Sequence, residues 1–128
     1  MLSKGILVLI MSQQDATTGQ FPYSFAGNGM TANALGIHAK PSDLDIYFLW
    51  GLAEYISATG DMKFLFDIVE FYCIHQLNTS HMCHKGTVLE HAKLSYYHLI
   101  RFIGIGESGL LKIGDGDWDD GIVVSTCL

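Results

Sequence analysis

The chain has 128 residues, of which 49% are hydrophobic and 16% are charged, and its mean hydropathy is +0.28. This composition fits one globular domain and excludes a disordered tail, which would have few apolar and many charged residues. The formal net charge of −6 argues against a nucleic-acid partner, because phosphate contacts need a basic face. The sequence contains no apolar run of the ~18 residues that a membrane-spanning helix requires, so we expect no membrane partner.

The chain contains three cysteines, Cys73, Cys83 and Cys127. An odd number cannot all pair within the chain, which excludes a disulfide scaffold. Cysteine usage of this kind favours a reducing compartment such as the cytoplasm, although the sequence otherwise leaves the localisation open.

The amino-terminal third of the chain reads as one helical segment followed by a long loop. Residues 1–11 are mostly apolar but too short, and too poorly followed by small residues, for a secretory signal, so we expect the end of a buried helix whose beginning is missing. Residues 12–42 are rich in Gly, Ser, Thr and Asn and hold both prolines, which predicts a long loop. Phe21, Tyr23 and Phe25 alternate there and would either anchor the loop or line a cleft.

Ser42 and Asp45 form a near capping box that opens a helix over 44–58. That stretch is apolar on nearly every side, which predicts an inner-layer helix buried all round, and Gly60 would end it. The single apolar stripe of 61–72 predicts an amphipathic outer-layer helix, and 74–86 reads as a polar connection.

Thr87 and Glu90 form a full capping box at the start of a helix that we expect to run to about Ile103. The tyrosines of that helix, Tyr96 and Tyr97, are expected in the core. His91, next to the capping Glu90, is expected to make structural hydrogen bonds rather than to be catalytic. Since β signals are almost absent, the fold class is all-α.

Histidines and cysteines, the usual ligands of a zinc site, occur in and next to the polar connection, but their spacings match no common zinc module. The residues concerned are Cys73, His75, His81, Cys83 and His84. We therefore assign no metal and no cofactor to the chain.

The clearest functional signal is an acidic glycine-rich segment, Ile-Gly-Asp-Gly-Asp-Trp-Asp-Asp-Gly, at 113–121. A solvated turn is one interpretation, but it would leave the Trp118 ring exposed. A calcium loop is a second, but Asp120 occupies the sixth position and Thr126 the twelfth, where an EF-hand needs Gly and Glu. The third is a sugar site, in which an indole stacks on the ring and a carboxyl group protonates the glycosidic oxygen.

Three motifs in order, at 50–61, 86–91 and 116–121, resemble the catalytic domain of cellobiose phosphorylase-like and related six-hairpin glycosidases. The loop at 41–45 is similar to that family's Ser-Asp-Asp loop at the mouth of the site. The resemblance covers roughly residues 5–123.

The resemblance implies an (α/α)6 barrel with an inner and an outer ring of helices. At the usual helix and connection lengths a double ring needs at least ~200 residues, and this chain supplies about four of the twelve helices. We therefore expect residues 1–128 to be a fragment of a single catalytic domain, with negligible activity in isolation.

The resemblance also implies the roles of individual residues. Asp120 corresponds to the general acid and Trp118 to the sugar platform, with Asp117 in the same loop. Asp43 and Asp45 correspond to substrate contacts at the mouth of the site, although simple capping of the helix is an equal alternative for both.

The implied reaction is inverting cleavage of an oligosaccharide or polysaccharide, with either water or inorganic phosphate as the nucleophile. The residues do not separate hydrolysis from phosphorolysis, because the sole arginine, Arg101, lies within a predicted helix. The alternative from another class is a non-catalytic helical module that binds carbohydrate or a partner protein through Trp118 and the loop aromatics.

Overall fold

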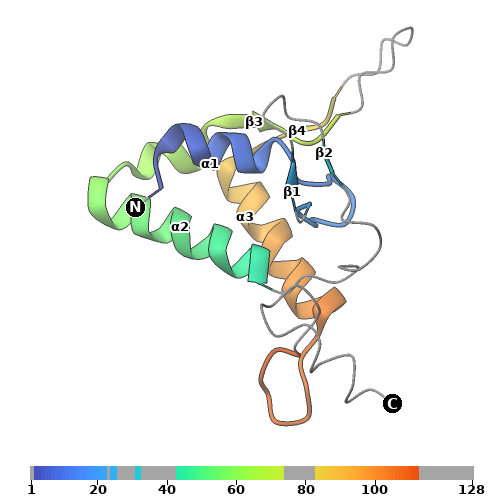
Figure 1. Ribbon diagram of the computed structural model, residues 1–128. Helices are drawn as coiled ribbons and strands as arrows, with labels where there is room; N and C mark the ends of the chain where they lie inside the picture. The colour runs from blue at the N-terminus through green and yellow to red at the C-terminus, as the bar shows by residue number, and fades with distance from the viewer. Residues whose placement is uncertain (1, 23, 26–30, 33–42, 74–82, 113–128) are drawn as a thin grey trace, which may run out of the picture.

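The structure is a computed structural model that describes residues 2–22, 24–25, 31–32, 43–73 and 83–112 (Figure 1). The acidic segment at 113–121 lies outside the described residues. In chain order the elements are α1 (Lys4–Met11), β1 (Ser24–Phe25), β2 (Thr31–Ala32), α2 (Asp43–Thr59), the 3₁₀ helix η1 (Met62–Phe66), β3 (Ile68–Glu70), β4 (Lys85–Thr87), α3 (Val88–Tyr97) and the π-helical η2 (His98–Ile103).

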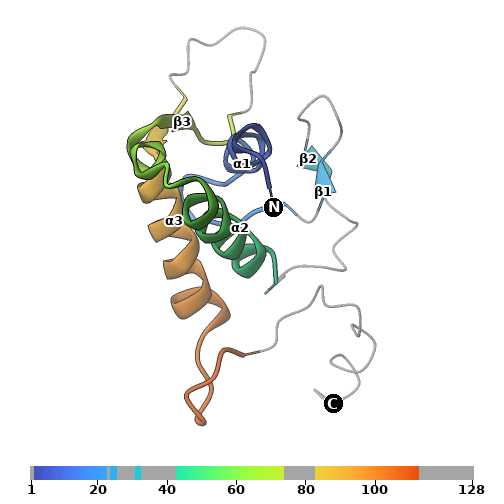
Figure 2. The same ribbon diagram turned by 90° about the vertical axis from the view of Figure 1, so that its left-hand side faces the viewer.

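The described part of the chain is mainly helical, which confirms the coarse expectation of a helical fold. α2 packs against both α1 and α3, and it begins beside the carboxyl-terminal half of α3 (Figures 1 and 2). Two short antiparallel strand pairs, β1–β2 and β3–β4, depart from a purely helical fold. Closure into a barrel remains a prediction.

α1 begins within the chain rather than continuing an earlier helix. The Ser3 side chain accepts a hydrogen bond from the Ile6 backbone N–H at 3.3 Å and so caps the first turn. The expectation that 1–11 is the end of a longer helix is therefore wrong. Leu7 and Met11 are fully buried, so α1 packs through one side only.

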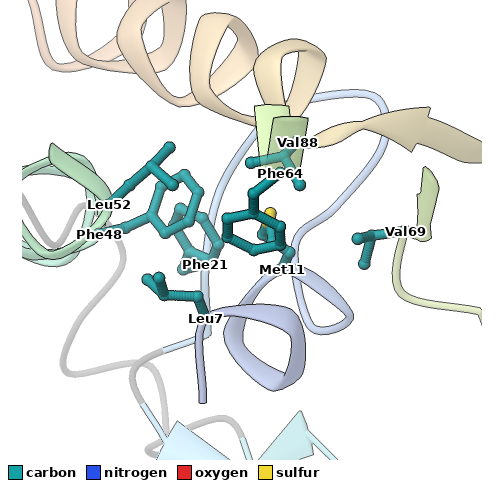
Figure 3. Packing of buried hydrophobic residues seen from close by; sticks show 8 residues of the cluster. All are labelled: Leu7, Met11, Phe21, Phe48, Leu52, Phe64, Val69 and Val88. Atoms are coloured by element: carbon teal, nitrogen blue, oxygen red, sulfur yellow. The ribbon is translucent and has the colours of Figure 1, made fainter. Parts of the chain in front are cut away.

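The core lies between α1, α2 and η1. Leu7 and Met11 of α1 meet Phe48 of α2, and Phe64 of η1 fills the space beside them (Figure 3). The Phe21 ring packs on Phe48 with centroids 4.9 Å apart, so this loop aromatic serves as an anchor. The same apolar cluster includes Leu52 of α2, Val69 of β3 and Val88 of α3. It therefore packs β3 and the start of α3 against the helices.

The α2 helix is not buried all round in this chain. Its buried residues are Asp45, Phe48, Gly51 and Leu52, whereas Tyr47 and Trp50 are 59% and 60% exposed. The expectation of burial on nearly every face is therefore wrong for the described elements, because α1 and α3 cover only one side of α2. Gly60, with φ 68°, ends α2 as expected.

Residues 61–72 do not form the expected amphipathic helix. Asp61 caps only the short η1, and Asp67 then adopts an extended conformation. The β-branched pair Ile68 and Val69 follows and pairs with β4, with Ile68 opposite Thr87. The helical stripe was outweighed by long-range strand pairing, which sequence periodicity does not report.

α3 has the predicted capping box: the Thr87 hydroxyl accepts from the Glu90 N–H at 3.1 Å, and the Glu90 carboxylate accepts from the Thr87 N–H at 2.6 Å. Gly104, with φ 89°, follows η2 and ends the helical run as expected. Tyr96 and Tyr97 are about half exposed in this chain, so the expectation of core positions is wrong for them.

Cys73 and Cys83 form a disulfide bond. The cysteine count excluded a scaffold of paired cysteines, but it did not foresee one bond. The inference of a reducing compartment therefore loses its support. Because both sulfurs are bonded to each other, neither is a free thiolate for the zinc alternative.

Candidate functional site

The described part of the candidate site begins at the first turn of α2. The Asp45 side chain is 1% exposed, and both of its oxygens are engaged by α3 and η2. Oδ1 accepts a hydrogen bond from Ser95 Oγ at 2.7 Å, and Oδ2 lies 2.6 Å from His98 Nδ1. We call Asp45, Ser95 and His98 the Asp45 cluster.

The geometry of the Asp45 cluster determines which nitrogen carries the proton. A carboxylate only accepts hydrogen bonds, so the short contact requires that His98 Nδ1 donates. Among the described residues Nε2 is buried without a hydrogen-bond partner, and the Phe102 ring stacks on the imidazole at 5.0 Å. The amino-terminal turn of α2 also favours a negative charge on Asp45.

Asp43 occupies the first position of α2 and is partly buried. Its assignment and that of Asp45 as substrate contacts remain predictions. For Asp45, both oxygens are already used within this chain, which favours a positioning role over direct contact with a sugar.

A second buried polar cluster lies at the amino-terminal half of α3. Gln14 Nε2 donates to the carbonyl oxygens of Gly19 at 2.9 Å and His91 at 3.2 Å. The amide oxygen of Gln14 therefore faces His91 Nδ1, 2.7 Å away, and His91 must donate there. We call Gln14 and His91 the Gln14 cluster.

Burial lowers the pKa of the His91 imidazole, although the Val69 carbonyl 3.2 Å from Nε2 acts to raise it. The imidazole also stacks on Phe71 with centroids 3.8 Å apart. These contacts agree with the expected structural role of His91. Sequence reasoning missed Gln14, because a glutamine in a polar loop carries no signal of burial.

Two neighbouring cavities open beside α2. The first, of about 170 Å³, is lined by Leu2, Ile10, Gln13, Phe21, Pro22, Leu44, Tyr47 and Phe48. The second, of about 390 Å³, is lined by Leu2, Tyr47, Trp50, Gly51 and Glu54. Both walls are mainly apolar. The first cavity lies between α2, α1 and the loop residues Phe21 and Pro22, whereas the second lies against the exposed Tyr47 and Trp50 of α2.

The residues expected to do the chemistry, Asp117, Trp118 and Asp120, lie outside the described residues. After Gly104 the chain forms a turn closed by a bridge between Ile105 and Leu111, and the acidic segment follows in sequence. The structure thus brings Asp45 to the junction of α3 and η2, in the helical run that precedes the acidic segment in sequence. The positions of the acid and the indole remain predictions.

Within the described ranges, no three His, Cys, Asp or Glu side chains lie close enough together to hold a metal ion. Nor does any helix of that part of the chain combine the length and hydrophobicity needed to cross a bilayer.

The sequence profile of the glycosyl hydrolase 94 superfamily, catalytic domain, matches residues 18–127. The chain belongs to this family. The match includes α2, α3 and the whole acidic segment, and it confirms the resemblance to six-hairpin glycosidases of the cellobiose phosphorylase type. A comparison with curated protein sequences gives no significant match.

The glycosyl hydrolase 94 superfamily, to which the chain belongs, comprises enzymes that cleave glycosidic bonds by hydrolysis or phosphorolysis. Oligosaccharides are the substrate class of the family. The motifs at 50–61, 86–91 and 116–121 all fall within the matched residues.

Proposed function

We propose that this chain is part of a glycoside-cleaving catalytic domain in which Asp120 protonates the departing sugar oxygen. The observation that carries the proposal is the Gly-Asp-Trp-Asp-Asp-Gly segment at 116–121, which lies within the residues matched by the family profile. It combines a carboxyl group with an aromatic face, the two groups that a sugar-cleaving site needs most.

The mechanism follows from the chemistry of an acetal. Trp118 stacks on the sugar ring, and Asp120 donates a proton to the glycosidic oxygen as the bond to the anomeric carbon breaks. Water or inorganic phosphate attacks that carbon from the opposite face, which inverts its configuration. Asp117 and Asp43 hold sugar hydroxyl groups.

Asp119 stands beside Asp120 where the family commonly has Asn. A second carboxylate next to the acid raises its pKa by like-charge repulsion, which keeps Asp120 protonated at a higher pH. An Asp119→Asn variant should therefore move the basic limb of the pH–rate profile toward lower pH. An unchanged profile would remove this role from Asp119.

The exposed aromatic side of α2 supports the proposal that the domain continues beyond the described helices. Tyr47 and Trp50 are 59% and 60% exposed on a helix whose mean character is apolar. Such a surface is normally covered by another element. Further helices of an (α/α)6 barrel would cover it, and we expect negligible turnover by this chain in isolation.

The decisive experiment uses an active enzyme that contains the complete domain. Asp120→Asn should lower kcat by about 10²–10⁴-fold on an ordinary oligosaccharide, because the proton donor is lost. Activity should return largely with a dinitrophenyl glycoside, whose leaving group needs no proton. The matched control is Asp115→Asn, which removes a carboxylate from the same segment but should leave both rates within a few-fold.

A fall of less than tenfold for Asp120→Asn on the oligosaccharide would contradict the assignment. Binding of oligosaccharide without any turnover by the unsubstituted complete domain would favour the non-catalytic module instead.

A further inference from the structure

We propose that Asp45, Ser95 and His98 are positioning residues that fix the first turn of α2 against the end of α3 and thereby hold Asp43 at the sugar site. The inference rests on the proposed function, because it concerns the same site. It differs from the family-based expectation, in which Asp45 itself contacts the substrate.

The place of the Asp45 cluster in the chain is the first observation. Asp43 stands two residues before Asp45 at the start of α2. On the other side, His98 is the first residue of η2, which leads through Gly104 toward the acidic segment in sequence. The cluster therefore joins the turn that carries Asp43 to the helical run that precedes the acidic segment in sequence.

The geometry of the cluster is the second observation. Ser95 and His98 are spaced three residues apart and so lie on one side of the helical run. Their donors reach different oxygens of the same carboxylate, at 2.7 and 2.6 Å. One hydrogen bond would allow α2 to slide or turn, whereas two directional bonds to one planar group fix both its position along α3 and its rotation.

Burial is the third observation. Asp45 is 1%, Ser95 0% and His98 3% exposed. Taking a carboxylate and an imidazole out of water opposes folding, and well-packed apolar side chains at such positions are often as stabilising or more so. Stability alone does not account for a charged cluster here, but fixing the relative position of two helices does.

The first test measures local order in the 128-residue chain by amide hydrogen exchange. The amides of Tyr47, Phe48 and Leu49 close the first turns of α2. Asp45→Asn should accelerate their exchange by a factor at least about ten times larger than the factor by which it accelerates exchange in the rest of the chain. The control is Val88→Ala, a buried position at the other end of α3 that should accelerate exchange more evenly. A uniform acceleration in Asp45→Asn would overturn the proposal.

The second test is a spectroscopic signature of the cluster. Two-bond ¹H–¹⁵N correlations of the His98 ring should show a protonated Nδ1 in the unsubstituted chain and in Ser95→Ala, which keeps the Asp45–His98 contact. A ring protonated at Nε2 alone would overturn the cluster as described. Because Ser95→Ala removes only one donor, it serves if Asp45→Asn fails to fold.

The third test asks whether the cluster acts through Asp43, in an active enzyme that contains the complete domain. Asp45→Asn should raise KM about tenfold with a smaller change in kcat, and Asp43→Asn should do the same. The double variant should be no worse than Asp43→Asn alone, because the positioned group is already gone. Fully additive effects would overturn the proposal.

The two proposals fail in different ways. If Asp120→Asn has no effect on turnover while exchange in Asp45→Asn is still localised to α2, the proposed acid is wrong and the positioning of α2 stands. If Asp120→Asn abolishes turnover but Asp45→Asn behaves like Val88→Ala, the proposed function stands and the positioning role is wrong.

Discussion

A buried histidine packs at each end of α3, but the two histidines have hydrogen-bond partners of different charge. Each end carries a fully or almost fully buried histidine, His91 or His98, and the two are about two turns apart on the same side of the helical run. At one end the partner is the neutral amide of Gln14, and at the other it is the carboxylate of Asp45.

The difference shows what each end contributes. The Gln14 cluster joins the loop after α1 to α3 through hydrogen bonds between uncharged groups. Such satisfied buried hydrogen bonds stabilise the fold without burying a charge. The Asp45 cluster buries a charge, which is costly to isolate, and it joins the start of α2 to the helical run that precedes the acidic segment in sequence. Removing one partner should therefore have unequal effects at the two ends.

The largest effect is expected for Asp45→Ala. It leaves His98 Nδ1 and Ser95 Oγ without an acceptor in a dry interior and creates a small void. The free energy of unfolding should fall by about 3–5 kcal/mol, as for removal of one member of a buried pair. Urea denaturation at neutral pH measures this directly, and a loss below about 1 kcal/mol would mean that the cluster is not a tightly coupled unit.

A smaller effect is expected at the other end for Gln14→Leu, which roughly keeps the volume of the side chain but removes its amide group. His91 Nδ1 and the Gly19 carbonyl then lose their partners. The expected loss is about 1–3 kcal/mol, the cost of buried neutral groups left unsatisfied. If Gln14→Leu proved as damaging as Asp45→Ala, the distinction between a neutral and a charged end would fail.

Thr87→Ala tests the solvent-facing part of the neutral end. It removes the hydroxyl that accepts from the Glu90 N–H and should cost about 1 kcal/mol. Thermal denaturation can compare it with Thr87→Ser, which keeps the oxygen and should retain most of the stability. Equal losses for the two substitutions would show that the hydroxyl is not the stabilising group.

What the sequence predicted well was governed by neighbouring residues. The Thr87–Glu90 capping box and the glycines Gly60 and Gly104 act within one turn, so their signals are local and the structure confirms them. The segment 61–72 failed because its conformation depends on pairing with β4, a segment beyond the reach of a periodicity argument.

The site was predictable to the same limited extent. The capping pattern drew attention to Asp45 at the start of α2, but nothing in the sequence pairs it with Ser95 and His98, which become neighbours only when α2 packs on α3. The acidic segment was recognisable from its residue types alone, and the family profile covers it. Its spatial relation to Asp43 is a tertiary property that no local pattern encodes.

The last and smallest effect expected is a pH dependence that arises at the neutral end of α3. Burial lowers the pKa of His91 below its ordinary value of about 6.5, so the unfolded chain takes up a proton at a higher pH than the folded chain. The stability linked to His91 is thus fully present above pH ~6.5 and is lost as pH falls below that value toward the lowered pKa. Unfolding free energies between pH 7.5 and 5 should fall more steeply in the unsubstituted chain than in His91→Gln, which cannot take up the proton. Parallel curves for the two proteins would mean that the pKa of His91 does not change on folding and that its burial contributes nothing to the pH dependence of stability.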